Sequence, residues 1–172
     1  MVLPKKEARL FFKLYLPLLG YANLYNGKNK KRTLAEVRKL LYKNPRIFKG
    51  YISNNPNKLN KENLAIIENW QRFIKGDFIL IKSFAKYSIL LKIDNNMSKV
   101  YGVLGLTDSP LDLAVNGIGT YFKDVVLLPW KNQIIWDGLF CLQPIIIGRN
   151  YIKSFINTYK EIKKKGEIID SI

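Results

Sequence analysis

The 172-residue sequence contains no histidine and a single cysteine, and both shortages exclude chemistry. Without histidine there is no Ser-His-Asp or Cys-His catalytic site, no histidine-ligated metal and no imidazole acid–base step. A lone Cys141 allows neither an intramolecular disulfide nor a cysteine-cluster zinc site. No run approaches the roughly 18 uncharged apolar residues that span a bilayer. Glu7 and Lys13 interrupt the N-terminal stretch that looks like a secretion signal, so we expect a cytoplasmic protein with no membrane span.

Acidic residues are also scarce. The chain has 13 Asp and Glu against 29 Lys and Arg, which gives a formal net charge of +16. Codon bias in an AT-rich genome would raise lysine but also glutamate, and only six glutamates are present. The excess is uneven: residues 1–76 hold 17 basic and 4 acidic groups, residues 77–148 hold 6 of each, and residues 149–172 hold 6 basic and 3 acidic groups. Such a field attracts nucleic acid, an anionic membrane surface or an acidic protein.

The hydrophobic pattern before Gly76 is typical of helices. We expect one helix to begin at Pro4 and to kink or end at Pro17. A second helix begins at the capping box TLAE, in which Thr33 accepts from a backbone amide, and it ends before Pro45. Two more helices are expected around residues 47–52 and from Asn60 to a stop at Gly76.

Beyond Gly76 the pattern is typical of strands. Strands are expected over 78–84, 87–93, 99–107, 125–128, 133–136 and 139–147, with Pro144 restricting the last to an edge or bulge. A short helix is expected near 111–115, and Asn150 caps a final helix that ends near Lys165. Three strands, a short helix and two strands fit a barrel of the oligonucleotide-binding (OB) type, while an SH3-like barrel or a plain sheet fits nearly as well.

We therefore predict an α+β protein with a helical N-terminal part, a small antiparallel β barrel or sheet and a packed C-terminal helix. The predicted regions are a basic helical region at 1–76, the β region at 77–148 and the C-terminal helix at 149–172. Trp130 and Trp136 flank an expected hairpin, and we expect them in the core rather than on an exposed stacking platform.

Four stretches carry a resemblance. They are LYKNPRIFKGYISNNP at 41–56, WQRFIKG at 70–76, VYGVLGL at 100–106 and LLPWKNQIIWDGL at 127–139. In these stretches the chain resembles a group of uncharacterised bacterial proteins, some of which carry a cysteine-rich metal-binding tail that this chain lacks. The resemblance implies that the helices and the β region occur together as one unit. It implies no activity, substrate or catalytic residue.

Basic residues gather around the second expected helix, interleaved with tyrosines. Flexible cations contact phosphates, a helix N-terminus adds amide donors, and tyrosines stack on unpaired bases. The sequence therefore predicts a nucleic-acid-binding surface, with RNA or single strands preferred, made by Lys28, Lys30, Lys31, Arg32, Arg38, Lys39, Lys43, Arg46, Lys49, Tyr42 and Tyr51. The alternative is a solvated lysine-rich face over a core that contains those tyrosines.

Two other classes of function stay open. An adaptor or inhibitor that docks on an acidic protein, within a defence or mobile-element system, would use the same charge. A metal-dependent nuclease needs several carboxylates converging on strands beside a lysine, and nothing in the sequence places together the aspartates of the β region: Asp77, Asp94, Asp108, Asp112, Asp124 and Asp137. We predict a non-enzymatic nucleic-acid-binding accessory protein with no catalytic residue, metal or small-molecule cofactor.

Overall fold

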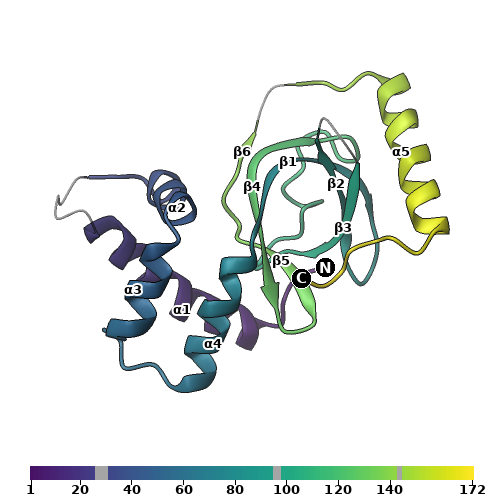
Figure 1. Cartoon of the computed structure of the whole chain (residues 1–172). Coiled ribbons are helices and arrows are strands. Elements are labelled where there is room, and N and C mark those ends of the chain that lie inside the picture. Colours follow the sequence, from purple (N-terminus) through teal and green to yellow (C-terminus); the bar gives the residue numbers. More distant parts are fainter. Residues whose placement is uncertain (26–30, 95–97, 143–144) are drawn as a thin grey trace. The chain divides into compact units, whose positions relative to one another are not determined.

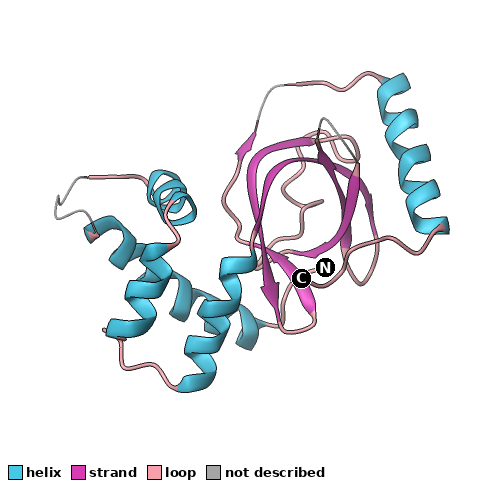
Figure 2. Cartoon of the chain, in the orientation of Figure 1, coloured by secondary structure: helices cyan, strands magenta, loops and turns pink. Residues whose placement is uncertain are grey.

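The computed structural model describes residues 1–25, 31–94, 98–142 and 145–172. The chain forms two compact units. The helical unit is Pro4–Arg72, and the sheet unit is Met1–Leu3 together with Phe73–Ile172. Figure 2 shows helices in the first unit and strands with a long helix in the second, which confirms the α+β class. None of the helices within the described ranges is long and apolar enough to cross a membrane.

The helical unit packs around its first helix. Its elements are α1 (Lys5–Leu24), α2 (Leu34–Lys43), α3 (Arg46–Asn54), α4 (Lys61–Asn69) and the 3-10 turn η1 (Trp70–Arg72). The buried side chains of α1 include Phe11, Leu14 and Leu18 at helical spacing. Of the two outcomes expected at Pro17, the end of the helix is wrong, because α1 continues to Leu24, and the kink stays a prediction. Its apolar face stays buried beyond the proline, and that burial outweighs the loss of one backbone donor.

The fourth helix begins where the sequence predicts and ends earlier. The Asn60 side chain accepts a hydrogen bond from a first-turn amide at 2.9 Å, as expected of an N-cap. The predicted stop at Gly76 is wrong, since Gly76 lies inside the first strand. Trp70 ends the α-helix and is fully buried, with its ring centroid 5.3 Å from that of Phe11 and 5.6 Å from that of Tyr15.

The strands of the sheet unit pair in a closed circuit (Figure 1). They are β1 (Ile74–Ser83), β2 (Ser88–Ile93), β3 (Lys99–Leu104), β4 (Tyr121–Trp130), β5 (Gln133–Trp136) and β6 (Cys141–Leu142). The order is β1-β2-β3-β5-β4-β6. Because β1 also pairs with β4, the circuit consists of the five strands β1, β2, β3, β5 and β4, and β6 pairs with β4 outside it. All these pairs are antiparallel except β3 with β5. The prediction of an antiparallel sheet is therefore wrong at this pair, because a circuit with an odd number of strands cannot alternate in direction throughout.

The connection from β3 to β4 contains turns in place of the short helix expected at 111–115. Ser109 and Asp112 cap each other: the Ser109 N–H donates to the Asp112 carboxylate at 2.9 Å, and the Asp112 N–H donates to the Ser109 hydroxyl at 3.2 Å. The Leu113 N–H donates to the Ser109 carbonyl at 3.2 Å, so a single helical turn forms. Leu111 and Val115 are exposed, and a turn that buries so little apolar surface does not extend.

Both faces of the strands β1 to β3 are buried. One face contributes Phe78, Leu80, Leu90 and Val103 to a cluster that contains Trp136. The other face meets α5 (Arg149–Lys164), where Ile79, Ile81, Leu91 and Val100 surround Tyr159. Because both faces are covered, residues 78–81 form a continuous buried run rather than an alternating one. This packing confirms the predicted C-terminal helix against the sheet, and Figure 1 shows α5 alongside the strands.

The remaining expectations concern the hairpin and the last strand. Trp130 and Trp136 are 2% and 1% exposed, which confirms their place in the core. Trp136 packs edge-on against Phe122 and Phe140, both at 4.8 Å between ring centroids. The strand expected over 139–147 is reduced to Cys141–Leu142 in the described residues. Its predicted restriction by Pro144 lies outside the described residues.

Candidate nucleic-acid interface

α2 begins at a complete capping box. The Thr33 hydroxyl accepts a hydrogen bond from the Glu36 N–H at 3.3 Å, and the Glu36 carboxylate accepts one from the Thr33 N–H at 2.7 Å. The hydrogen bond from the Thr33 backbone, followed by that from its hydroxyl, lowers the pKa of the Glu36 carboxyl. The start of α2 therefore carries a carboxylate, which opposes the predicted contribution of a helix N-terminus to phosphate binding.

The cations that follow the cap lie on the outer faces of two adjacent helices. Lys39 and Lys43 are one turn apart on α2, and Arg46 and Lys49 are one turn apart on α3. All four side chains are exposed, as is that of Lys31 in the segment before α2. We call these five residues the basic surface. The buried residues of α2 and α3 lie on the opposite side of each helix.

Aromatic packing joins the two helices beneath the basic surface. The ring centroids of Tyr42 on α2 and Phe48 on α3 lie 5.9 Å apart, and both residues are buried. α1 contacts both α2 and α3 from within the same unit. The cations of the two helices are therefore carried on one packed core rather than on independent segments.

Three of the predicted site residues are interior. Arg38, Tyr42 and Tyr51 are 1%, 7% and 0% exposed, so their predicted place on the surface is wrong. The Tyr42 hydroxyl lies 3.2 Å from that of Tyr15, the Tyr51 hydroxyl donates to the Asn57 side chain at 2.9 Å, and burial raises the pKa of Tyr51. The alternative considered above, a core that contains the tyrosines, is what the structure shows for this pair. The sequence signal for this burial is helical spacing, because Tyr42 and Tyr51 lie on the same helix faces as the buried apolar residues of α2 and α3.

The remaining predicted residues precede α2. Arg32 is half-buried, and its guanidinium donates to the Asn23 backbone carbonyl at 3.1 Å and to the Asn23 side-chain oxygen at 3.0 Å. These bonds attach the segment before α2 to the end of α1, which gives Arg32 a positioning role. Lys28 and Lys30, also predicted at the site, lie outside the described residues.

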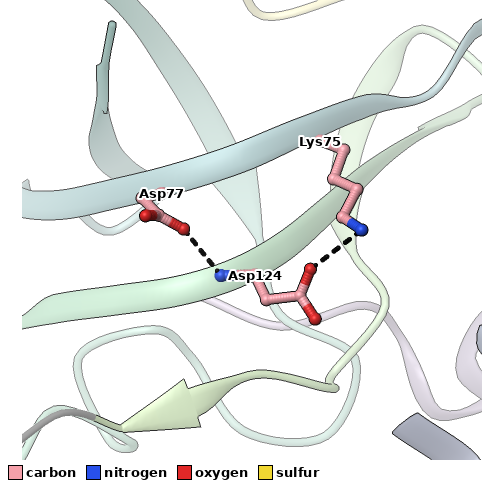
Figure 3. Close-up of polar contacts among 3 residues, drawn as sticks. All are labelled: Lys75, Asp77 and Asp124. Atoms are coloured by element: carbon pink, nitrogen blue, oxygen red, sulfur yellow. Dashed lines mark hydrogen bonds and ion pairs between the residues drawn. The ribbon is translucent and has the colours of Figure 1, made fainter. Parts of the chain in front are cut away.

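A second polar cluster lies in the sheet unit and was not expected from the sequence. Lys75 and Asp77 on β1 meet Asp124 on β4 (Figure 3). The Lys75 ammonium lies 3.0 Å from the Asp124 carboxylate, and the Asp77 carboxylate accepts the Asp124 N–H at 2.9 Å and the Tyr121 hydroxyl at 2.6 Å. Nothing in the sequence placed these two aspartates together, and the bond between them joins the Asp77 carboxylate to the Asp124 backbone. Asp77 and Asp124 are 47 residues apart, and no local signal relates them.

This cluster stabilises an irregular part of the sheet. The β1–β4 register shifts between Gly76 and Phe78, and Asp124 has a φ of 59°, in the left-handed region that costs a non-glycine residue about 1–2 kcal/mol. The bond from its N–H to Asp77 offsets part of that cost. Burial, then the hydrogen bond to Asp77, raises the pKa of Tyr121 to about 12. Across the ranges that the structure describes, no group of three or more His, Cys, Asp or Glu residues is placed to hold a metal ion.

Comparison with known proteins assigns no function to the chain, so a function is inferred from the side chains described above. No family model, curated protein or solved structure matches the chain. The resemblance to the uncharacterised bacterial group accordingly stays a prediction.

Proposed function

We propose that the protein is a non-enzymatic nucleic-acid-binding accessory protein of the cytoplasm, which holds its ligand by phosphate contacts from the basic surface. The helical unit carries 16 Lys and Arg against 4 Glu in its sequence. Glu36 is the single acidic residue in the sequence between positions 31 and 49, and its carboxylate is engaged by Thr33. The local field is therefore strongly positive.

The observation that carries the proposal is the placement of the cations. Lys39, Lys43, Arg46 and Lys49 are exposed on helices whose opposite faces are buried, so the cations project from a preformed scaffold. A polyanion that contacts these side chains releases condensed counterions, which is the dominant sequence-independent contribution to nucleic-acid affinity. The basic surface suits such contacts because lysine and arginine stems reach along a helix surface while their charged ends stay solvated.

The buried tyrosines change the expected mode of binding. Tyr42 and Tyr51 do not reach the basic surface, so stacking on unpaired bases by these two side chains does not support a preference for single strands. We propose that the surface reads the phosphate backbone and that its affinity depends on charge density. On this account RNA and DNA of the same strandedness bind with affinities within about tenfold of each other.

The direct test is a fluorescence-polarisation titration with labelled single-stranded and double-stranded 20-mers of RNA and DNA at 50 mM and 200 mM salt. With five phosphate contacts, the affinity for a duplex is expected to fall by about 10² to 10³ between the two salt concentrations. Affinity that does not change with salt, or the absence of binding to every probe at 50 mM, contradicts the proposal.

A second candidate, an adaptor that docks on an acidic protein, is favoured by apolar side chains near the same cations. Leu24 and Tyr25 at the end of α1 and Leu34 at the start of α2 are 59%, 37% and 53% exposed. The bonds from Arg32 to Asn23 keep these two helix ends together. Copurification of one acidic protein after nuclease treatment, abolished by Leu34→Ser, supports this candidate over the first.

A further inference from the structure

A different cationic site lies in the sheet unit, at the turn between β1 and β2. A pocket of about 340 Å³ is lined by Phe84, Ala85, Lys86 and Tyr87 from this turn and by Tyr159 and Lys163 from α5. Its volume falls near the lower end of the range typical of small-molecule sites, about 300–1,000 Å³. The site is made entirely by the sheet unit.

The pocket has two aromatic walls set at an angle. The rings of Phe84 and Tyr87 are edge to face, with centroids 5.9 Å apart and an interplanar angle of 76°. The Phe84 N–H donates to the Tyr87 carbonyl at 2.9 Å, and the hydroxyls of Ser83 and Ser88 lie 3.1 Å apart, so the turn is closed by hydrogen bonds at its base. Tyr159, which is 5% exposed, anchors α5 beside the turn. The walls are therefore preorganised for a flat ligand.

Lysines surround these walls. The Lys82 ammonium lies 4.8 Å from the Phe84 ring centroid and the Lys163 ammonium 6.0 Å from it, both within the range of a cation–π interaction. Lys86 lines the pocket and is exposed. Among the described residues that line the pocket, none is acidic. A ligand that complements this site has a flat aromatic part and a negative charge.

We propose that the pocket binds a nucleotide, with the base against Phe84 and Tyr87 and the phosphate near Lys86 and Lys163. Aromatic side chains stack on any base, and lysines provide mobile point charges for phosphate. The nucleotide is either a free nucleoside monophosphate or one unit of a single strand, since both present the same chemistry. The site stands on its own contacts and does not require the basic surface of the helical unit.

The test is a two-dimensional ¹H–¹⁵N NMR titration of the full chain with adenosine monophosphate. Amide shifts are expected in residues 83–88 and 159–163. Adenosine alone and inorganic phosphate alone are each expected to bind at least tenfold more weakly, because each satisfies half of the site. Phe84→Leu keeps an apolar side chain and removes the stacking face, so it is expected to weaken binding about tenfold.

Charge variants separate an effect on binding from an effect on folding, because they change exposed side chains. Lys163→Ala changes an exposed side chain, and it is expected to weaken binding about threefold. Lys153→Ala, an exposed lysine more than two turns earlier on α5, removes the same charge and is expected to leave binding unchanged. Equal affinities for the wild type, Phe84→Leu and Lys163→Ala overturn the proposal, as does the absence of shifts in these segments.

A hexa-adenylate titration distinguishes the two sources of the nucleotide. If the hexamer shifts the same amides at a concentration at least tenfold below that of the monophosphate, the pocket takes one unit of a strand. If the monophosphate shifts these amides and the hexamer does not, the ligand is free nucleotide. If both ligands shift only residues 31–49, the pocket proposal is wrong while the proposed function stands.

Discussion

Gly105 provides a demanding test of the packing at the end of β3. Its N–H donates to the Met1 carbonyl at 3.1 Å, and its carbonyl accepts from the Leu3 N–H at 3.0 Å, so both backbone groups of Gly105 are bonded to the N-terminal segment. A Cβ at this position would lie 1.8 Å from the Asp108 carbonyl oxygen and 3.0 Å from the Ser109 Cα. Ordinary contact begins at 3.4 Å, so the turn has to move by about 1.6 Å. The obstacle is backbone, which cannot rotate away as a side chain does.

The change Gly105→Ala is therefore expected to lower the free energy of unfolding of the sheet unit by about 3 kcal/mol. Overpacking accounts for about 1–3 kcal/mol and the weakened hydrogen bonds to Met1 and Leu3 for about 1 kcal/mol more. The matched control is Gly20→Ala. That glycine lies inside α1 with no atom within 4 Å of its Cβ position, so alanine there is expected to add about 0.5–1 kcal/mol to the helical unit.

Urea denaturation measures both changes. Tryptophan fluorescence reports the sheet unit mainly through Trp130 and Trp136, while far-ultraviolet circular dichroism follows the helices. The reasoning is refuted if Gly105→Ala unfolds within 0.5 kcal/mol of the wild type, about the margin of a neutral surface substitution. It is also refuted if the two glycine variants shift the midpoint in the same direction.

Two further predictions concern single hydrogen-bonding groups. Thr33→Ala removes the cap of α2 and is expected to lower the free energy of unfolding by about 1 kcal/mol in urea denaturation. Thr33→Ser keeps the hydroxyl and is expected to stay within about 0.5 kcal/mol of the wild type, so equal losses for the two variants would contradict a capping role for this hydroxyl. The pKa of Tyr121 is raised to about 12 from its ordinary value of 10.0, so the neutral phenol adds stability that is complete below pH 10 and is lost as the pH rises towards 12. Tyr121→Phe is expected to reduce this alkaline loss by about 1 kcal/mol after solvent screening, measured as the difference between urea denaturation at pH 9 and pH 12. An unchanged pH dependence would exclude ionisation of the Tyr121 phenol as the cause of the loss.

Features encoded within a few residues were predicted well. The capping box at Thr33 and the N-cap at Asn60 each use atoms three residues apart, so the sequence alone indicates them. The burial of Trp130 and Trp136 follows from their side-chain type. The end of the helix expected at Pro17 is wrong because helix propensity describes an isolated helix, whereas here tertiary burial continues past the proline.

Features that depend on distant residues were not predicted. The parallel pair of β3 and β5 follows from closure of the strand circuit, which local patterns do not encode. The contact between Asp77 and Asp124 joins two strands far apart in the chain. At the candidate site the exposed cations followed from helical spacing, but Arg38 was assigned to the surface by its charge although its position matched the buried face.

The most direct measurement of the central claim is the slope of log affinity against log salt for a 20-base-pair duplex. The test variant carries alanine at all five positions of the basic surface: Lys31, Lys39, Lys43, Arg46 and Lys49. The control carries alanine at five exposed lysines of the sheet unit, which removes the same charge: Lys99, Lys123, Lys153, Lys160 and Lys164.

Each lost phosphate contact reduces the slope by about 0.9, so the test variant is expected to lose about 4.5 units of slope. The control is expected to lose less than 1 unit, because its lysines make no phosphate contact in this account. Equal slopes for the two variants would show that net charge, rather than the basic surface of α2 and α3, holds the nucleic acid.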